Sequence, residues 1–229
     1  MRSPRIVLGQ TRTAMKQILL PVLLCAALLA SGQETSKLNK VDIDYMMRGY
    51  FYASSKGPSE LNGLGGWGGS SNGARSFTPP AGGSGLRILV DTTAVVAVDG
   101  KFRGQRVVVR NNGPDTLYFP AQDSRLYMKT QALRADSFAD IEYLPSSWCG
   151  NSYHTLFLAP GEQWEFIMPR YEGARTTRSR IELTYNTTSD ERKKARVAYS
   201  HTFPIGVNEE QFSNKVEYCR GGLMDPYED

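Results

Sequence analysis

Apolar and polar residues alternate in short runs from Leu86 onward, and turn residues separate one run from the next. This period of two, together with many β-branched and aromatic residues, is typical of half-buried β-strands. Asp99-Gly100 and Ala159-Pro160-Gly161-Glu162 carry the glycines that tight turns require. The pattern predicts strands over Leu86–Val98, Arg106–Gly113, Thr116–Pro120, Arg125–Leu133, Asp140–Leu144, Tyr153–Leu158, Gln163–Met168, Ser179–Thr187 and Arg196–Val207.

These runs follow one another without helical periodicity between them and without a repeat of fixed period. Short strands with turn signals about every 8–12 residues are typical of antiparallel sandwiches and barrels, whereas alternation with helices would indicate a parallel sheet. The sequence therefore predicts a mainly β fold, an immunoglobulin-like antiparallel β-sandwich, over residues 86–207.

The pattern changes in the C-terminal segment, residues 208–229. Phe212, Val216 and Cys219 lie at positions i, i+4 and i+7, which share one face of a helix. Asn208 is a suitable N-cap, two glutamates follow it, and a pair of glycines ends the pattern. We expect a short C-terminal helix and tail that pack on the sandwich.

Residues 33–85 have a composition unlike that of the strands. The stretch from Lys56 to Gly85 contains ten glycines and three prolines, a density that gives a flexible chain. We interpret residues 33–85 as a flexible Gly-rich N-terminal segment that acts as a tether. The alternative is that the apolar cluster Val41–Tyr52 docks on the domain or on a partner, with the Gly-rich stretch as a leash.

The apolar run Ile18–Ala30 follows Lys16 and precedes small residues, as in a secretory signal peptide. A membrane-spanning helix needs roughly 20 apolar residues, more than this run provides. We expect residues 1–32 to be cleaved, which leaves no transmembrane segment. The mature chain is then exported to the periplasm, the outer-membrane surface or the extracellular space.

Two details of this segment stay open. Met15 followed by a lysine is itself a normal signal-peptide start, so residues 1–14 have a second interpretation as an artefact of start-codon choice. Lipidation at Cys25 is the alternative to cleavage after the apolar run. It is disfavoured because large leucines precede Cys25 and apolar residues follow it.

The formal net charge of +4 comes from the N-terminal segment. Residues 1–32 contain four of the 27 basic residues and no acid, which leaves 23 bases against 23 acids in residues 33–229. Binding of nucleic acid through phosphate contacts needs a surplus of Lys and Arg on one face. We therefore expect no nucleic-acid partner.

Two cysteines, Cys149 and Cys219, remain after signal cleavage. Disulfides persist outside the cytosol, so a disulfide between these two is the favoured interpretation. The alternatives are free structural thiols and a nucleophilic Cys149 with His154 as its base, for which the local sequence has no known signature. His201 has no metal-ligand spacing with these residues, so we expect neither a metal nor a cofactor.

The stretch SSWCGNSYH, Ser146 to His154, is the candidate binding loop. A disulfide at Cys149 anchors this loop in our interpretation, with Trp148 as its packing residue. The basic stretch Arg170–Arg180 is a second candidate contact segment. The partner is expected to be a protein or glycan of the cell envelope. The residues expected to meet it in the first loop are Trp148, Asn151, Tyr153 and His154.

Two stretches resemble immunoglobulin-like sandwiches of secreted bacterial proteins, in particular exported proteins of Bacteroidota-type bacteria. They are VVVRNNGPDTLYFPAQDSRLYMKTQAL (Val107–Leu133) and LAPGEQWEF (Leu158–Phe166). A looser resemblance links them to a small proteinase-inhibitor sandwich, of which the Pro-Gly-Glu turn matches but no reactive loop does. These motifs report strand and turn geometry, so the resemblance implies a fold and no catalytic residues.

The expected function is that of a non-catalytic binding or structural module of the bacterial envelope. An envelope hydrolase that uses strand-borne glutamates or histidines is the alternative from another class. A proteinase inhibitor that presents the loop Leu144–Ser152 is the third hypothesis. The carboxylates available to a hydrolase are Glu142, Glu162, Glu165 and Glu182.

Overall fold

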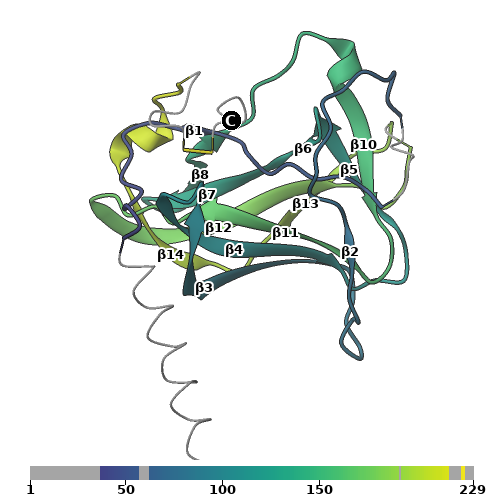
Figure 1. Ribbon diagram of the computed structural model, residues 1–229, viewed down its shortest axis with the longest axis horizontal. Coiled ribbons are helices and arrows are strands. Elements are labelled where there is room, and N and C mark those ends of the chain that lie inside the picture. Colours follow the sequence, from purple (N-terminus) through teal and green to yellow (C-terminus); the bar gives the residue numbers. More distant parts are fainter. Residues whose placement is uncertain (1–36, 57–61, 191, 217–222, 225–229) are drawn as a thin grey trace, which may run out of the picture. The chain divides into compact units, whose positions relative to one another are not determined.

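The structure is a computed structural model that describes residues 37–56, 62–190, 192–216 and 223–224 (Figure 1). The chain divides into two units, Met1–Lys37 and Leu38–Asp229, and all elements below belong to the second unit. The predicted signal peptide, residues 1–32, lies outside the described residues. In the described part of the chain, no helix is long and apolar enough to cross a membrane.

Four antiparallel strands form the first sheet, in the order β2-β11-β4-β3. The turn between β3 and β4 contains Asp99 and Gly100, whose φ angles of 49° and 63° are those of the tight hairpin that the sequence predicts. The register of β3 against β4 shifts between Asp91 and Val96. The strands of this sheet are β2 (Arg75–Ser76), β3 (Leu86–Val98), β4 (Phe102–Asn111) and β11 (Glu162–Pro169).

The second sheet is built around the long strand β12 (Arg175–Tyr185). On one edge, β12 pairs with β7, and β8 extends the sheet beyond β7. On the other edge, β14 pairs with the first half of β12 and β13 with its second half. The other strands are β7 (Met128–Arg134), β8 (Ser137–Asp140), β13 (Arg196–Tyr199) and β14 (Phe203–Val207).

Two smaller groups of strands complete the fold. In the three-stranded sheet, β5 (Leu117–Gln122) lies between β6 (Arg125–Leu126) and β10 (Tyr153–Leu158). Strands β1 (Met47–Arg48) and β9 (Glu142–Tyr143) form a parallel pair. The chain is thus mainly β, with several antiparallel sheets, one of which curls into a half-barrel.

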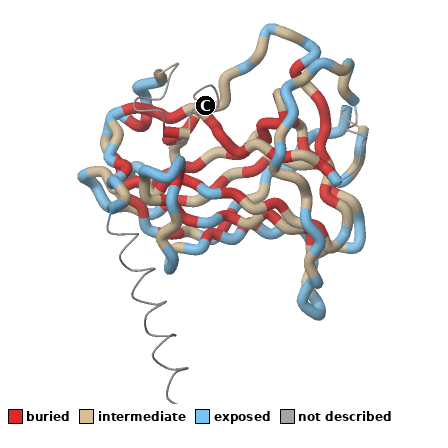
Figure 2. The backbone as a smooth tube through the Cα atoms, in the orientation of Figure 1, coloured by how far each residue is buried: buried red, intermediate tan, exposed pale blue. Residues whose placement is uncertain are grey.

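Alternate residues of the long strands enter one hydrophobic core, seen as the red positions in Figure 2. Trp164, Phe166 and Met168 on β11 are buried, while Glu165 and Ile167 between them are half-buried or exposed. This is the period of two on which the strand predictions rest. Burial of a large apolar side chain contributes about 1.5–3 kcal/mol, so these inward positions stabilise the fold.

The segment from Val41 to Ala53 belongs to the same core. Tyr45, Met47 and Phe51 are at most 2% exposed, and the Phe51 ring meets Phe166 edge-on with centroids 5.4 Å apart. The interpretation of residues 33–85 as a flexible tether does not describe this segment, and the docking alternative does. A short apolar cluster beside a Gly-rich stretch gives no sign of the distant strands that it covers.

The C-terminal segment forms one turn of 3-10 helix, η2 (Glu209–Phe212), where the sequence predicts a longer α-helix. Asn208 and Gln211 make the capping box that opens this turn. Beyond it, Met46 N–H donates to Asn214 O at 2.8 Å, and Lys215 forms a bridge with Met46. Pairing with the N-terminal segment thus replaces helical hydrogen bonds, and the helix prediction is wrong up to residue 216. Residues 217–222 lie outside the described part of the chain.

Candidate functional site

The loop Leu144–Ser152 connects β9 to β10 and carries the most exposed large apolar side chain of the described residues. Trp148 is 98% exposed. The prediction that Trp148 packs the loop is therefore wrong, because its indole ring points into solvent. Near its end the loop makes a short 3-10 turn, η1 (Gly150–Ser152), seen at the top of Figure 1.

Hydrogen bonds of the described residues hold this loop in place. Ser147 is the hub: its Oγ accepts from Cys149 N–H at 3.1 Å and from Ser152 Oγ at 3.1 Å, and its carbonyl accepts from Tyr153 Oη at 2.8 Å. At the base of the loop, the buried Arg125 donates from Nη2 to Pro145 O at 2.6 Å. The loop is therefore an ordered support that presents the Trp148 indole ring.

A second loop, Asn62–Asn72, lies beside the first. Trp67 stacks on His154 of β10, with ring centroids 4.5 Å apart and an interplanar angle of 18°. Gly68 is fixed on both sides, since its N–H donates to Asp123 Oδ1 at 3.0 Å and its carbonyl accepts from Ser124 Oγ at 2.8 Å. The Gly-rich stretch from residue 62 onward thus follows a defined path over β5 and β10.

The two loops together form what we call the Trp148 surface, defined as residues 62–72 and 144–152. They touch where Gly66 lies next to Asn151. Besides Trp148, this surface exposes Leu64, which is 81% accessible. The site predicted from the sequence did not include Leu64 or Trp67. Their large apolar side chains among glycines and serines could have indicated that they belong to it.

The predicted site residues have different places in this surface. Asn151 is exposed beside Trp148, and Tyr153 is half-buried with its hydroxyl used inside the loop. His154 is 2% exposed and lies beneath Trp67, so it cannot meet a partner while the Trp67 stack is in place. Trp148 and Asn151 are therefore both exposed on the same loop, whereas His154 is buried below Trp67.

Cys149 is partly buried and forms no disulfide with a described residue. Its predicted disulfide partner, Cys219, lies outside the described residues, and the structure shows no disulfide in the part that it describes. The pairing stays a prediction. Among the described His, Cys, Asp and Glu residues, no group of three or more is arranged to hold a metal ion.

Glu142, one of the four carboxylates considered for hydrolysis, is a buried hub of the core. Its side chain is 0% exposed. Oε1 accepts from the hydroxyls of Tyr50 and Tyr171, both at 2.8 Å, and Oε2 accepts from Thr130 N–H at 2.8 Å. Burial raises the pKa of Glu142, whereas these hydrogen bonds lower it. The cluster joins the N-terminal segment to β7, β9 and the chain after β11.

The two tyrosines of this cluster also have shifted pKa values. Burial raises the pKa of both Tyr50 and Tyr171 well above the ordinary value, and the neighbouring Glu142 carboxylate raises them further. Both hydroxyls therefore stay protonated and act as donors to Glu142. A buried carboxylate that receives three hydrogen bonds meets the rule that buried charge must be hydrogen-bonded.

The other three glutamates are also engaged in the fold. Glu162 Oε2 accepts from Ala159 N–H at 2.9 Å and so closes the turn before β11. Glu165 pairs with Arg75 at 3.8 Å, and Glu182 pairs with Lys129 at 3.4 Å. Each of the four carboxylates thus has a structural partner within the described residues.

The second predicted contact segment, Arg170–Arg180, is not a single loop. Arg170 follows β11, whereas β12 already begins at Arg175. Arg180 on β12 lies between two aromatic rings, 4.3 Å from the centroid of Phe138 and 3.7 Å from that of Tyr199. Stacking on both faces holds this guanidinium on the sheet by cation–π attraction.

In comparisons with family models, curated proteins and solved structures, the chain has no match. The immunoglobulin-like arrangement and the relation to exported proteins therefore stay predictions. What the structure shows is the mainly β architecture with several antiparallel sheets.

Proposed function

We propose that this chain is a non-catalytic binding module of the cell envelope that attaches to a protein partner through the Trp148 surface. The observation that carries the proposal is the 98% exposure of Trp148 on a loop held by its own hydrogen bonds. Tryptophan is enriched among the residues that dominate binding energy in protein interfaces. An ordered loop also loses little conformational entropy when a partner binds.

A protein partner is favoured over a glycan because of Leu64. This aliphatic side chain is 81% exposed on the neighbouring loop, and it offers apolar area without an aromatic face. Large exposed apolar patches that are rimmed by polar residues mark protein-interaction sites. Ser146 and Asn151, which are exposed near Trp148, supply such a polar rim.

The non-catalytic part of the proposal is supported by the carboxylates. Glu142 is buried at the centre of a tyrosine cluster, and Glu162, Glu165 and Glu182 each serve a turn or an ion pair. The location outside the cytoplasm is supported by the signal-peptide pattern of residues 1–32.

The test is a capture experiment with the mature chain and matched variants. The bait is immobilised, exposed to envelope extract, and the captured proteins are identified by mass spectrometry. The variants are Trp148→Ala and Leu64→Ala on the surface, and Val197→Ala as a control, since Val197 is 48% exposed on β13. A specific partner should be retained by the wild type and by Val197→Ala and lost from both surface variants.

The affinity for the captured protein is then measured with purified components. Loss of a central tryptophan contact should weaken binding by at least about 2 kcal/mol, or roughly 30-fold. Equal affinities of the wild type and Trp148→Ala would contradict the proposal. Binding to a glycan array that depends on Trp148, without any captured protein, would replace the protein partner by a glycan.

A further inference from the structure

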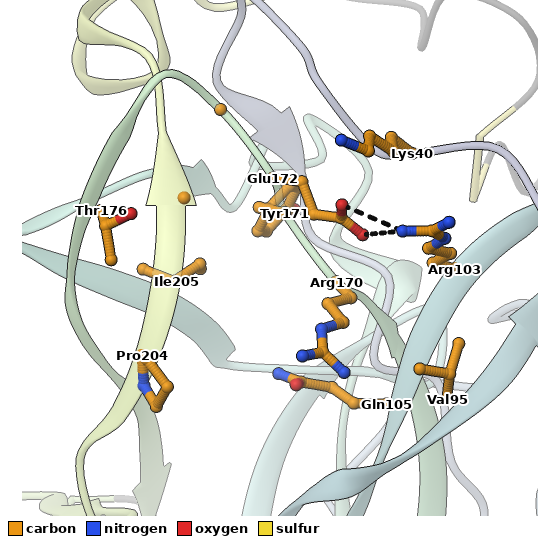
Figure 3. Close-up of a pocket in the computed structure, with 12 residues that line it drawn as sticks. Lys40, Val95, Arg103, Gln105, Arg170, Tyr171, Glu172, Thr176, Pro204 and Ile205 are labelled. Atoms are coloured by element: carbon orange, nitrogen blue, oxygen red, sulfur yellow. Dashed lines mark hydrogen bonds and ion pairs between the residues drawn. The ribbon is translucent and has the colours of Figure 1, made fainter.

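A polar cleft of about 470 Å³ opens between the edges of the two larger sheets (Figure 3). One wall comes from the first sheet, with Val95 of β3 and Gln105 of β4, and the other from the second sheet, with Thr176 of β12 and Ile205 of β14. None of the lining residues belongs to the loops of the Trp148 surface. The cleft is therefore a separate site, independent of the function proposed above.

Positive charge dominates the lining of this cleft. Lys40, Arg103 and Arg170 face it together with a single carboxylate, Glu172. Arg103 Nη1 lies 3.3 Å from both carboxylate oxygens of Glu172, so these two charges compensate each other. Within the described residues, the side chains of Lys40 and Arg170 make no ion pair or hydrogen bond. Among the described residues, Arg170 and Lys40 are therefore uncompensated, and they lie at opposite ends of the cleft (Figure 3).

A buried amide lies close to Arg170 (Figure 3). Gln105 is 3% exposed, and among the described residues its side chain makes one hydrogen bond, from Nε2 to Met168 Sδ at 3.4 Å. A thioether sulfur is a weak acceptor, so this buried donor is poorly satisfied. Figure 3 shows the Arg170 guanidinium pointing toward the same part of the cleft as the Gln105 amide.

The opposite side of the cleft is apolar. Pro204 and Ile205 of β14 lie across from Arg170 and Gln105, whereas Val95 lies on the wall that carries Gln105 (Figure 3). Gly173 and Gly206 face each other there, and a Cβ on Gly206 would come within 2.7 Å of Gly173 N. This close approach of two backbones leaves no room for a side chain at either position.

We propose that this cleft binds a small organic carboxylate with an apolar body. Arg170 pairs with the carboxylate group, Gln105 donates a further hydrogen bond, and the body of the ligand packs on Pro204 and Ile205. Hydrogen bonds from Arg or Lys to a carboxylate are about twice as strong as neutral ones. The volume of the cleft is in the range of roughly 300–1,000 Å³ that small-molecule sites occupy.

The test follows backbone amide chemical shifts by NMR while benzoate is added to the mature protein. Benzyl alcohol is the neutral ligand of matched size, and glucuronate is the carboxylate with a polar body. Benzoate should give saturable shifts at β14 and after β11, and bind at least about tenfold more tightly than either comparison ligand. Equal binding of benzoate and benzyl alcohol, or no saturable binding of benzoate, would overturn the proposal.

Three variants test how individual residues contribute to benzoate binding. Arg170→Gln should weaken benzoate binding about tenfold, because it removes an uncompensated charge. Glu172→Gln should tighten it several-fold, because it releases Arg103 from its ion pair. Arg87→Gln removes an exposed arginine of β3 that does not line the cleft, and it should leave the affinity unchanged.

Benzoate affinity should fall in Arg170→Gln and rise in Glu172→Gln. These opposite changes distinguish a specific site from a general effect of charge. An unchanged affinity in Arg170→Gln would refute the assignment. If Arg170→Gln does not fold, Arg170→Lys replaces it; this variant keeps the charge, removes the planar guanidinium and should still weaken benzoate binding. Loss of affinity in Arg87→Gln equal to that in Arg170→Gln would also count against the site.

Discussion

The indole ring of Trp67 covers the imidazole ring of His154, with the two centroids 4.5 Å apart and the planes inclined by 18°. Together with the hydrogen bonds of Gly68, this stack fixes the Gly-rich loop on the sheet, since glycine contributes no side chain of its own to such a contact. The relationship also explains why His154 is buried although it lies on a strand at one margin of a sheet.

Replacing Trp67 by Ala should release the loop 62–72 from the sheet. We expect a loss of about 1–2 kcal/mol in the free energy of unfolding and faster amide hydrogen exchange in that loop, because the stacking contact and its buried area disappear. Hydrogen exchange with mass spectrometry measures the second effect. Leu64→Ala in the same loop is the control, since Leu64 is 81% exposed; equal exchange rates in the two variants would show that the stack does not hold the loop.

The two other tryptophans differ sharply in burial. We therefore expect their replacement by Ala to reduce the free energy of unfolding by very different amounts. Trp164 is 0% exposed and donates from Nε1 to Ser54 O at 2.8 Å, so Trp164→Ala should cost about 3–5 kcal/mol of stability. Trp148→Ala should change stability by less than about 0.5 kcal/mol, because its side chain is 98% exposed. Urea denaturation of both variants compares the two values. A stability loss in Trp148→Ala similar to that in Trp164→Ala would contradict the exposed position of Trp148.

Tyr171 donates to the buried Glu142 carboxylate, and its removal should leave that carboxylate short of a partner. A hydrogen bond to a charged group contributes about 1.5–3 kcal/mol, so we expect Tyr171→Phe to lose roughly this amount. The control is Tyr118→Phe on the half-buried face of β5, where the hydroxyl makes no hydrogen bond within the described residues. Denaturant titration of both variants decides the matter, and equal stabilities would show that the Tyr171 hydroxyl is not needed.

Glu142 gives the fold a pH dependence of definite sign. Burial raises its pKa above the ordinary value of 4.5, so the folded state binds its proton more tightly than the unfolded state does. Its contribution to stability is complete below pH 4.5 and is lost as the pH rises through the folded-state pKa. The loss amounts to about 1.4 kcal/mol for each pKa unit of the shift.

The measurement compares the wild type with Glu142→Gln, which keeps the shape of the side chain and does not titrate. The free energy of unfolding is determined for both proteins across the acidic and neutral range. Subtracting one curve from the other removes the contribution of all other carboxylates. The advantage of the wild type should shrink as the pH rises; an advantage that grows with pH would mean that the pKa of Glu142 is lowered instead.

Local patterns of the sequence were enough for most strands and turns. The bounds of Leu86–Val98 and Tyr153–Leu158 were predicted as the structure has them, and so was the tight turn at Asp99-Gly100. Alternation of apolar residues and the need of a turn for glycine act over a few neighbouring positions. Such features can be recognised without knowledge of the tertiary structure.

The sequence alone did not reveal contacts between distant segments. Glu142 meets Tyr50 across 92 residues, Trp67 meets His154, and Lys40 shares a cleft with Arg103 and Arg170. Each of these contacts depends on which segment of the chain packs against which sheet. The C-terminal helix prediction failed for the same reason, because pairing with the N-terminal segment satisfies its backbone groups after one turn.

The sequence by itself determined that the chain is mainly β and where most of its strands lie. Only the tertiary structure decided that Val41–Ala53 joins the core, that Trp148 is exposed and that His154 is covered. The physical reason is that hydrophobic burial is not directional. An apolar side chain is stabilised by any partner that removes it from water, and the choice among partners is made by the whole fold.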